Sequence, residues 1–531
     1  MDRQYNDLTV RVSLYMVVTF FHGMLHKESG HMIKTDVVII GGGATGCGIA
    51  RDLALRGIHH YLVEKGDFAN GATGACHGLL HSGARYAVTD PQAARECISE
   101  NAILRRIARK CVETTGGLFV RLPGDSKRYR DTFLINCEEA KISTEVLSAS
   151  RALDLVPELN PSIEEAVVVP DCSIDPFRLC MLNAFTSRHK GGGILIHHKV
   201  IDIVKERGRC TGVKVLDRFT SQIKEIRAKI VINATGAWGD TLARMGGSDA
   251  PMTLSKGSLI ISNHRLTNMV INRLRAPSDG DIIVPNEAVC LAGTTSIPVD
   301  DPDAIEVDPR EVDLVATQAE QMLPRFGTTR LIRAYTGVRP LLKAEASDSR
   351  SISRGFKIID HKNGMFSILG GKLSTYRLMA EKTVDAVVKE FGIKARCKTA
   401  DIPLDGQDEL SGYPLSKRLK GIDNIVCECE LVDRTQVENA INSLGIQYIG
   451  DIQHRTRLGM GPCQGGFCTY RALGIMQETG RLTPDESIEI LKQFLQRRFR
   501  GIRPALWGDQ LREEQLVESI YLGILNMGQR A

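Results

Sequence analysis

The stretch DVVIIGGGATGCGIARDLALRG, residues 36–57, decides the fold class of this chain. Its first five residues form a continuous apolar run, which is typical of a parallel strand buried on both faces. A G-x-G-x-x-G turn follows, and then a helix-like run that ends at Gly57. A second apolar run, HYLVE, ends at Glu64. This order of strand, glycine turn, helix, strand and acid predicts a Rossmann-like α/β unit that binds a dinucleotide.

Each conspicuous residue of this unit has a physical role. Gly41 allows the tight turn, Gly43 lets the backbone approach a pyrophosphate, and Gly46 lets the helix pack closely on the strand. The helix N-terminus offers N–H groups to the phosphates, and Glu64 can accept hydrogen bonds from a ribose hydroxyl. The candidate nucleotide-binding residues here are Asp36, Gly41, Gly43, Gly46 and Glu64.

Two later segments favour FAD over NAD. KIVINATGAWGDTL (residues 229–242) resembles the second flavin-contact segment of flavoproteins with two dinucleotide-binding folds. GMFSILGGKLSTYRLMAE (residues 364–381) resembles the segment in which such proteins close the sheet and direct helix N–H groups at the flavin ring. An NAD enzyme has no need of this late return to the nucleotide domain. The further candidates for contact with FAD are Thr73, Thr235, Gly236, Gly370 and Gly371.

Length and composition describe an ordinary globular protein of more than one domain. The chain has 531 residues, 43% of them hydrophobic and 25% charged. Its net charge of +5 is mild, so it gives no case for nucleic acid but leaves room for a local basic pocket. Most of its fourteen cysteines stand singly, so we expect free thiols in a reducing cytoplasm.

The segment from about residue 91 to 330 predicts a substrate cap. Strand-like runs (AVVVP, ILIHHKVIDIV, GVKVL and SLIIS) alternate in it with helical ones such as CISENAILRRIARKCVE. DIIVPN followed by LAGTTSI adds two more strand-like runs. This alternation suits a mixed, largely antiparallel sheet laid over the flavin.

Several motifs together resemble a known family. ATGACHGLLHSGARYAVTD, YTGVRPL and GGKLSTYR are similar to the FAD-dependent glycerol-3-phosphate dehydrogenases of the D-amino-acid oxidase-like superfamily. Within this family the C-terminal part resembles the large subunits of the bacterial anaerobic enzymes. The similarity runs from about Thr35 to the C-terminus.

The resemblance implies a dianionic substrate, sn-glycerol 3-phosphate, and therefore a pocket with several cations. Arg85, Arg339 and Lys372 are the matching basic positions, and each stands in a glycine-containing turn. Arg333 is a further candidate for substrate binding, and Tyr86 and Thr375 can add hydrogen bonds. The implied reaction removes a hydride from the middle carbon to the flavin while a base takes the hydroxyl proton.

The base is the open assignment. Aerobic relatives carry a histidine after a Lys-Gly-Ser run, but Leu259 occupies that position in SKGSLIISNH. His81 and His264 are the possible substitutes, and His81 is nearer to the recognised motifs. We leave the base open between His81 and water.

Four cysteines near the C-terminus form two close pairs. Cys427 and Cys429 stand in VCECE, and Cys463 and Cys468 in GPCQGGFC. Four thiolates are the common ligand set of a [2Fe–2S] cluster, and helix-like runs after each pair can stabilise its negative charge. The arrangement resembles the module of bacterioferritin-associated ferredoxin. Zinc is the alternative, although its cysteine pairs more often have two or more intervening residues.

These observations divide the chain. We predict an upstream extension outside the fold at residues 1–31, an FAD-dependent oxidoreductase unit with its cap at 32–395, a linker at 396–424, a [2Fe–2S]-type module at 425–475 and a helical region at 476–531. The apolar part of the extension spans fourteen residues, fewer than the roughly twenty of a spanning helix. An interfacial anchor is the alternative interpretation of this extension.

The family resemblance also implies partners and a location. It implies a second catalytic subunit, together with a membrane-bound iron–sulfur subunit that delivers electrons to quinone in anaerobic respiration. The chain would then lie at the cytoplasmic face of the inner membrane, held there through its partners. Two other hypotheses remain: a related flavin dehydrogenase for a 2-hydroxy acid or imino acid, and a non-catalytic flavin and iron–sulfur electron carrier.

Overall fold

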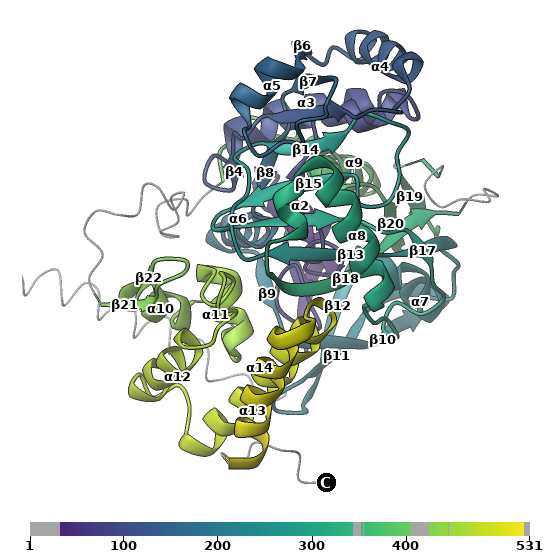
Figure 1. The fold of residues 1–531 in the computed structure, drawn as a ribbon. Helices are drawn as coiled ribbons and strands as arrows, with labels where there is room; N and C mark the ends of the chain where they lie inside the picture. Colours follow the sequence, from purple (N-terminus) through teal and green to yellow (C-terminus); the bar gives the residue numbers. More distant parts are fainter. Residues whose placement is uncertain (1–31, 344–351, 354, 405–423, 444, 525–531) are drawn as a thin grey trace, which may run out of the picture.

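The computed structural model describes residues 32–343, 352–353, 355–404, 424–443 and 445–524 (Figure 1). The predicted extension at residues 1–31 lies outside the described residues, as do residues 405–423 of the predicted linker. Within the described ranges, every helix is too short or too polar to cross a lipid bilayer.

The first sheet is built around the strand that opens the dinucleotide motif. Its strands are β10 (His198–Glu206), β11 (Arg209–Asp217), β12 (Ile223–Asn233), β1 (Ile33–Ile40), β2 (His60–Val63), β9 (Gly193–Leu195), β20 (Met365–Gly370) and β19 (Phe356–Asp360). β1 pairs in parallel with β2 and β12, β2 with β9, and β12 with β20. The late strand β20 therefore returns to the nucleotide sheet, as the sequence predicts.

Helices cover the first sheet and form its core. They are α2 (Ala44–Leu55), α3 (Pro91–Ile107), α6 (Pro176–His189), α7 (Gly239–Met245) and α9 (Tyr376–Glu390). α2 packs against α6 and α9, and fully buried side chains such as Ile39, Leu53 and Val384 belong to one core. Leu404, at the end of the described part of the predicted linker, joins this core. The predicted Rossmann-like α/β class is confirmed.

A second, mixed sheet forms the cap. Its strands are β17 (Ile297–Pro298), β13 (Met252–Ser262), β16 (Val289–Gly293), β15 (Ile282–Asn286), β14 (Val270–Arg273), β5 (Gly117–Arg121), β7 (Glu165–Val169), β6 (Glu145–Ser148) and β18 (Leu331–Leu342). The helices α4 (Lys127–Glu139), α5 (Ala149–Leu155) and α8 (Pro309–Met322) lie against it, and a small third sheet consists of β3 (Leu79–Leu80), β8 (Cys172–Ile174) and β4 (Val112–Glu113).

Two runs predicted for the cap belong instead to the first sheet. ILIHHKVIDIV forms β9 and β10, and GVKVL lies in β11. β11 pairs antiparallel with the first half of β12, and β10 continues outward from β11. The reason for the error is that β12 begins well before its parallel partner β20, so its early residues offer an edge to a local hairpin.

The C-terminal region forms a third body of mostly helical structure. Its elements are β21 (Ile425–Cys427), β22 (Val432–Asp433), α10 (Arg434–Ile441), α11 (Ile449–Thr456), α12 (Cys468–Glu478), α13 (Pro484–Ile502) and α14 (Gly508–Ser519). Figure 1 shows these elements at one end of the molecule, with α4 and α5 at the opposite end. Phe494 and Phe499 of α13 share a core with Cys427 and Cys468, so α13 packs as part of the cysteine module.

Buried polar contacts attach this module to the first domain. Asp67, in the loop after Glu64, lies 2.5 Å from Arg455 Nη1 and 2.7 Å from His454 Nδ1. Although burial opposes ionisation of Asp67, these two groups hold its pKa below the ordinary value. The ring of His454 also stacks on Phe177 at 4.2 Å. The module is therefore fixed against the loop that leads into the nucleotide site.

Candidate active site and cysteine centre

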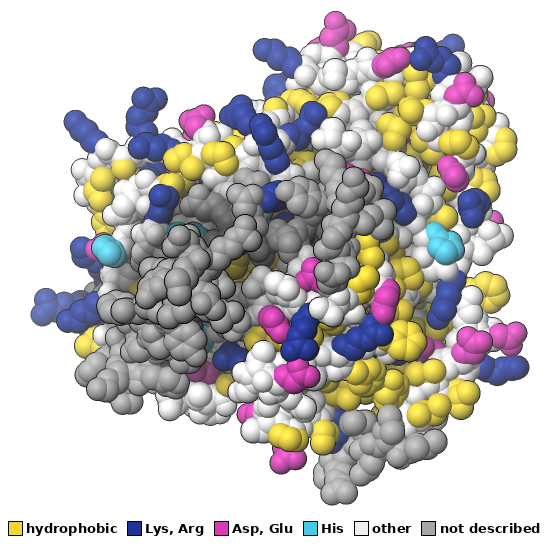
Figure 2. Space-filling view, turned by 90° about the vertical axis from the view of Figure 1, so that its left-hand side faces the viewer, with side chains coloured by type: hydrophobic (Ala, Val, Ile, Leu, Met, Phe, Trp, Pro, Cys, Tyr) yellow, Lys and Arg dark blue, Asp and Glu magenta, His cyan; other side chains and the backbone are white. Residues whose placement is uncertain are grey.

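Charge on the outside of the molecule is mixed, whereas the interior holds a concentrated positive region. Figure 2 shows a face on which basic and acidic side chains are interspersed. Inside, a cavity of about 820 Å³ extends from the glycine turn after β1 to the cap strands β13 and β18. This volume is at the upper end of the range for small-molecule and cofactor sites.

The glycine turn forms one end of the cavity. Gly41 has a φ of +111° and lies so close to Ala234 that a side chain would collide with its backbone. A Cβ on Gly46 would likewise collide with the carbonyl oxygen of Gly41, so only glycine lets α2 approach β1 this closely. No side chain caps α2 at Gly43, although the Ala44 N–H donates to Thr73 Oγ1 at 3.1 Å. Further N–H groups of this turn face a phosphate-sized space.

Glu64 stands at the end of β2 and lines the cavity. Its two carboxylate oxygens accept hydrogen bonds from the N–H groups of Gly42 at 2.6 Å and Gly66 at 2.8 Å. Burial raises the pKa of Glu64, while the two N–H donors oppose that shift. The carboxylate is thus held rigidly and keeps lone pairs for hydroxyl donors.

The other nucleotide candidates divide into two groups. Gly41, Gly43, Thr73, Thr235, Gly236, Gly370 and Gly371 line the cavity together with Glu64. Asp36 does not line it: its carboxylate lies on the earlier part of β1 and pairs with Lys229 Nζ at 2.7 Å. The assignment of Asp36 to the cofactor is therefore corrected, because dinucleotides bind beyond the carboxyl ends of the strands.

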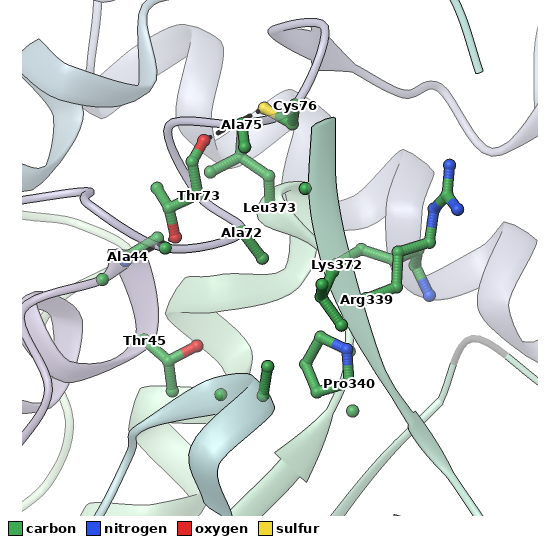
Figure 3. A pocket seen from close by; sticks show the side chains of 18 of the residues that line it. Ala44, Thr45, Ala72, Thr73, Ala75, Cys76, Arg339, Pro340, Lys372 and Leu373 are labelled. Atoms are coloured by element: carbon green, nitrogen blue, oxygen red, sulfur yellow. Dashed lines mark hydrogen bonds between the residues drawn. The ribbon is translucent and has the colours of Figure 1, made fainter. Parts of the chain in front are cut away.

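Three cations gather at the cap end of the cavity. Arg85, Arg339 and Lys372, named here the cation cluster, all line it. Figure 3 shows Arg339 and Lys372 at one end and Ala44 and Thr73 at the other. The arrangement offers a positively charged end, separate from the glycine turn, to a small anion.

The three cations are held in different ways. Arg339 donates to the carbonyl oxygen of Thr295 at 3.1 Å and to Thr294 Oγ1, so backbone and hydroxyl groups fix its guanidinium. Arg85 instead lies 3.3 Å from the buried carboxylate of Asp281, which offsets part of its charge. Lys372 Nζ lies 5.2 Å from the centre of the Tyr86 ring.

Two histidines stand among these cations. Both His77 and His81 line the cavity, and their ring centres lie 5.9 Å apart. Burial, with Arg339 and Arg85, lowers the pKa of His77 to about 3. Burial, with His77, Arg85 and Lys372, lowers the pKa of His81 well below its ordinary value. Both imidazoles are therefore neutral at pH 7 and able to accept a proton.

His77 was missed in the sequence, although it stands four residues before His81 in the motif ATGACHGLLHSGARY. Its Nδ1 atom is buried and has no hydrogen-bond partner among the described residues. The ring of His81 lies 5.2 Å from that of Tyr86, so Tyr86 does belong to the same group. The repeated histidine in one glycine-rich turn was the signal available.

Two predicted substrate ligands lie outside the cavity. The hydroxyl of Thr375 is fully buried and lies 3.3 Å from both the N–H and the carbonyl oxygen of Lys372, so it shapes the turn that carries this lysine. Arg333 points the other way, to the C-terminal module, where its Nη1 lies 3.5 Å from Gln464 Oε1. Both assignments to direct substrate binding are corrected by this geometry. His264, the other candidate base, does not line the cavity either.

The four predicted metal ligands adjoin one another. Cys468, the first residue of α12, forms hydrogen bonds with both Cys427 and Cys463, and Cys463 also interacts with Cys429. Hydrogen bonds from Cys468, and then from backbone N–H groups that include that of Gly466, lower the pKa of Cys463 to about 5. The loop is thus prepared for thiolates.

The donor set suits a two-iron cluster better than one zinc ion. In the part of the chain that the structure describes, no group of three or more histidine, cysteine, aspartate or glutamate side chains is arranged around a single metal ion. The thiols form a chain of contacts instead, and backbone N–H groups donate to their sulfurs. A [2Fe–2S] cluster shares four thiolates between two irons and is tuned by such N–H···S bonds, whereas structural zinc needs four ligands around one centre.

Comparisons with known proteins agree with both sites. The FAD dependent oxidoreductase family model matches residues 36–377, and the BFD-like [2Fe-2S] binding domain model matches residues 425–478. The large subunit of the anaerobic glycerol-3-phosphate dehydrogenase of Escherichia coli K12 is 43% identical over 93% of this chain and 97% of its own. The protein of the same name from Haemophilus influenzae is 41% identical over 95% and 96%.

A solved structure shares the fold. The glycerol-3-phosphate dehydrogenase from Bacillus halodurans, determined with FAD, superposes with a TM-score of 0.66 at 23% identity. The superposition covers 90% of this chain and 96% of that one. At this identity the likeness concerns the fold of the chain.

Proposed function

Because the chain belongs to the FAD-dependent oxidoreductase family and, within it, to the large subunits of the anaerobic glycerol-3-phosphate dehydrogenases, we propose that it oxidises sn-glycerol 3-phosphate to dihydroxyacetone phosphate and passes the electrons to a quinone through partner subunits. The observation that carries the substrate assignment is the cation cluster at the cap end of the cavity. Three positive side chains around one small space match a phosphate dianion.

FAD and a [2Fe–2S] cluster are the cofactors of this chain. When bound, FAD takes up the hydride, and the cluster takes up single electrons. The glycine turn and the N-terminus of α2 would hold the pyrophosphate, and Glu64 a ribose hydroxyl. Gly370 and Gly371, before α9, would approach the flavin ring.

The substrate-facing residues have separate tasks in this proposal. Arg339 and Arg85 bind the phosphate, and Lys372 stabilises negative charge that develops on the substrate oxygen. The cap excludes water, which strengthens each of these interactions. Thr375 acts at one remove, by fixing the turn that carries Lys372.

We assign the proton of the substrate hydroxyl to His81. Two observations support this choice: the pKa of His81 is low enough for a neutral ring, and Lys372, next to the glycines expected at the flavin, is among the charges that lower it. His77 is influenced by Arg339 and Arg85 instead, so we assign it to hydrogen bonding with the phosphate. Proton transfer by a positioned base contributes about 10²–10⁴-fold to a rate.

The two histidines can be distinguished by kinetics. We expect His81→Asn to lower the rate constant of flavin reduction by about 10²–10⁴-fold with little change in substrate affinity. We expect His77→Asn mainly to raise the dissociation constant of glycerol 3-phosphate. Anaerobic stopped-flow measurement of flavin bleaching against substrate concentration yields both constants. The opposite pattern, with the rate defect in His77→Asn alone, would transfer the base to His77.

The second part of the proposal concerns the path of the electrons. The cysteine module packs on the loop after Glu64 through Asp67, which supports transfer from the flavin to the cluster. The similar proteins are named as subunits, which supports the presence of partners: a second catalytic subunit, together with a membrane-bound iron–sulfur subunit. We propose a peripheral position on the cytoplasmic face of the inner membrane, held by these partners. The domain boundaries predicted from sequence also stay proposals.

Substrate specificity is tested with the purified chain and an artificial electron acceptor. We expect turnover with glycerol 3-phosphate and none with a 2-hydroxy acid or a cyclic imino acid of similar size. A preference for a carboxylate substrate would favour the related-dehydrogenase hypothesis over the present one. Failure of every small alcohol and acid to reduce the flavin would favour the electron-carrier hypothesis.

A further inference from the structure

Arg333 is a cation of the first domain that faces the cysteine module. It lies on β18, where it pairs with Ile261 of β13. Its guanidinium donates to Gln464 Oε1 at 3.5 Å and to the carbonyl oxygen of Arg497 at 3.3 Å. The packing on α13 is close, since a Cβ on Gly501 would lie 2.5 Å from Arg333 Cζ. The side chain thus fills the junction between the cap sheet and the module.

Positive charge accumulates at this junction. Burial, followed by Arg497, lowers the pKa of Arg333 to about 10, and Arg498 acts in the same direction. Among the described residues Arg333 has no carboxylate partner, whereas Arg498 pairs with Glu514 at 2.9 Å. The phenol of Tyr335 is the group that favours the charged form of Arg333, and its own pKa is raised by burial. The protein groups described here therefore leave this guanidinium without a compensating negative charge.

Gln464 connects Arg333 to the cysteine loop. It follows Cys463 directly, is buried and has a φ of +50°. Its side-chain amide donates to the carbonyl oxygens of Met460 at 3.1 Å and Gly461 at 3.0 Å, which leaves its oxygen to accept from Arg333. The contact from Arg333 thus fixes the loop that presents Cys463.

The same strand face leads to the substrate cavity. Residues 333, 335, 337 and 339 share one face of β18, because side chains alternate along a strand. Tyr335 Oη donates to the carbonyl oxygen of Cys76 at 2.9 Å, and Gly337 packs on Ala75. Arg339 lines the cavity at the far end. β18 is therefore in contact with both sites.

We propose that Arg333 is the counter-charge of the [2Fe–2S] cluster and the anchor of its Cys463 loop. A cluster bound by four thiolates carries net negative charge, and each electron it accepts adds one more. A nearby cation stabilises the reduced form more than the oxidised form, which raises the reduction potential. Arg333 is thus a positioning residue for electron transfer and takes no part in binding the substrate.

The proposal is tested on the full chain with both cofactors bound. We expect Arg333→Met to lower the midpoint potential of the cluster, followed by electron paramagnetic resonance during a redox titration. Two unit charges about 10 Å apart, at an effective dielectric constant of about 20, change an equilibrium constant by about tenfold, so the reduced fraction at a fixed potential should fall by about that factor. Arg333→Lys, which keeps the charge, should retain a potential near the original.

Matched controls separate this role from others. Arg330→Gln removes an exposed charge three residues away and should leave the potential unchanged. Flavin reduction by glycerol 3-phosphate should keep its rate and substrate affinity in Arg333→Met; a large loss of affinity would restore Arg333 to the substrate site and overturn the proposal. An unchanged potential in Arg333→Met would also overturn it. If Arg333→Met loses its iron while Arg333→Lys keeps iron and potential, the charge is required for retention; loss of iron in both would overturn the counter-charge role.

Discussion

Replacing Cys463 with serine is expected to stop electron delivery while glycerol 3-phosphate still reduces the flavin. Cys463 contacts both Cys468 and Cys429, so its loss removes the ligand in the middle of the thiol chain. The substrate cavity does not include this residue. We expect flavin bleaching in stopped flow to keep its rate within about twofold, and turnover with the physiological acceptor to fall by about a hundredfold or more, as for a step removed outright.

A matched cysteine outside the module provides the control for this change. Cys397 is a free, partly exposed thiol that contacts Thr399 in the first domain. Cys397→Ser should retain iron, visible cluster absorption and acceptor turnover. If Cys463→Ser turns over normally, the cluster does not carry the electrons. If it retains flavin but loses flavin reduction, the module acts on the substrate step as well.

Replacing Arg339 with alanine is expected to have the second large effect, a loss of about 10²–10³-fold in kcat/KM for glycerol 3-phosphate. A hydrogen bond to a charged group contributes about 1.5–3 kcal/mol, and a guanidinium can make two of them to one phosphate. Since the anchors of Arg339 are Thr295 and Thr294 of the cap, the glycine turn should keep its structure and bind flavin normally. Steady-state kinetics together with flavin content check both parts.

Two further variants sharpen this measurement. Arg339→Lys keeps the charge but loses the planar fork, so we expect an intermediate defect. Arg325→Ala, at an exposed position of the short helix Pro324–Gly327, should leave kinetics unchanged. Normal kinetics in Arg339→Ala would remove this arginine from the substrate site.

The dinucleotide unit was predictable from sequence because its determinants are local. Gly41, Gly46 and Glu64 act within one strand–turn–helix–strand unit, whose geometry follows from backbone sterics and hydrogen bonding. The four cysteines were predictable for a similar reason, since their spacing places them in two short loops. In both cases the chemistry lies in the sequence neighbours themselves.

The errors concern groups whose partners are distant in sequence. Arg333 and Arg339 lie on the same face of β18, yet six residues of strand separate them by about 20 Å. One therefore meets the module and the other the cavity, and only the docking of α13 decides which. Asp36 was misassigned because its place within β1, before the carboxyl end, was not weighed. His77 needed the cap in place before its exposure to the cavity could be recognised.

The account's central claim is that the cation cluster presents a phosphorylated alcohol to the flavin. Anaerobic titration of the purified chain with glycerol 3-phosphate, followed by visible spectrum, tests it most directly. We predict that the flavin absorption bleaches at near-stoichiometric substrate and that the cluster absorption then declines. A flavin that stays oxidised at a large excess of glycerol 3-phosphate, in protein with both cofactors bound, would contradict the claim.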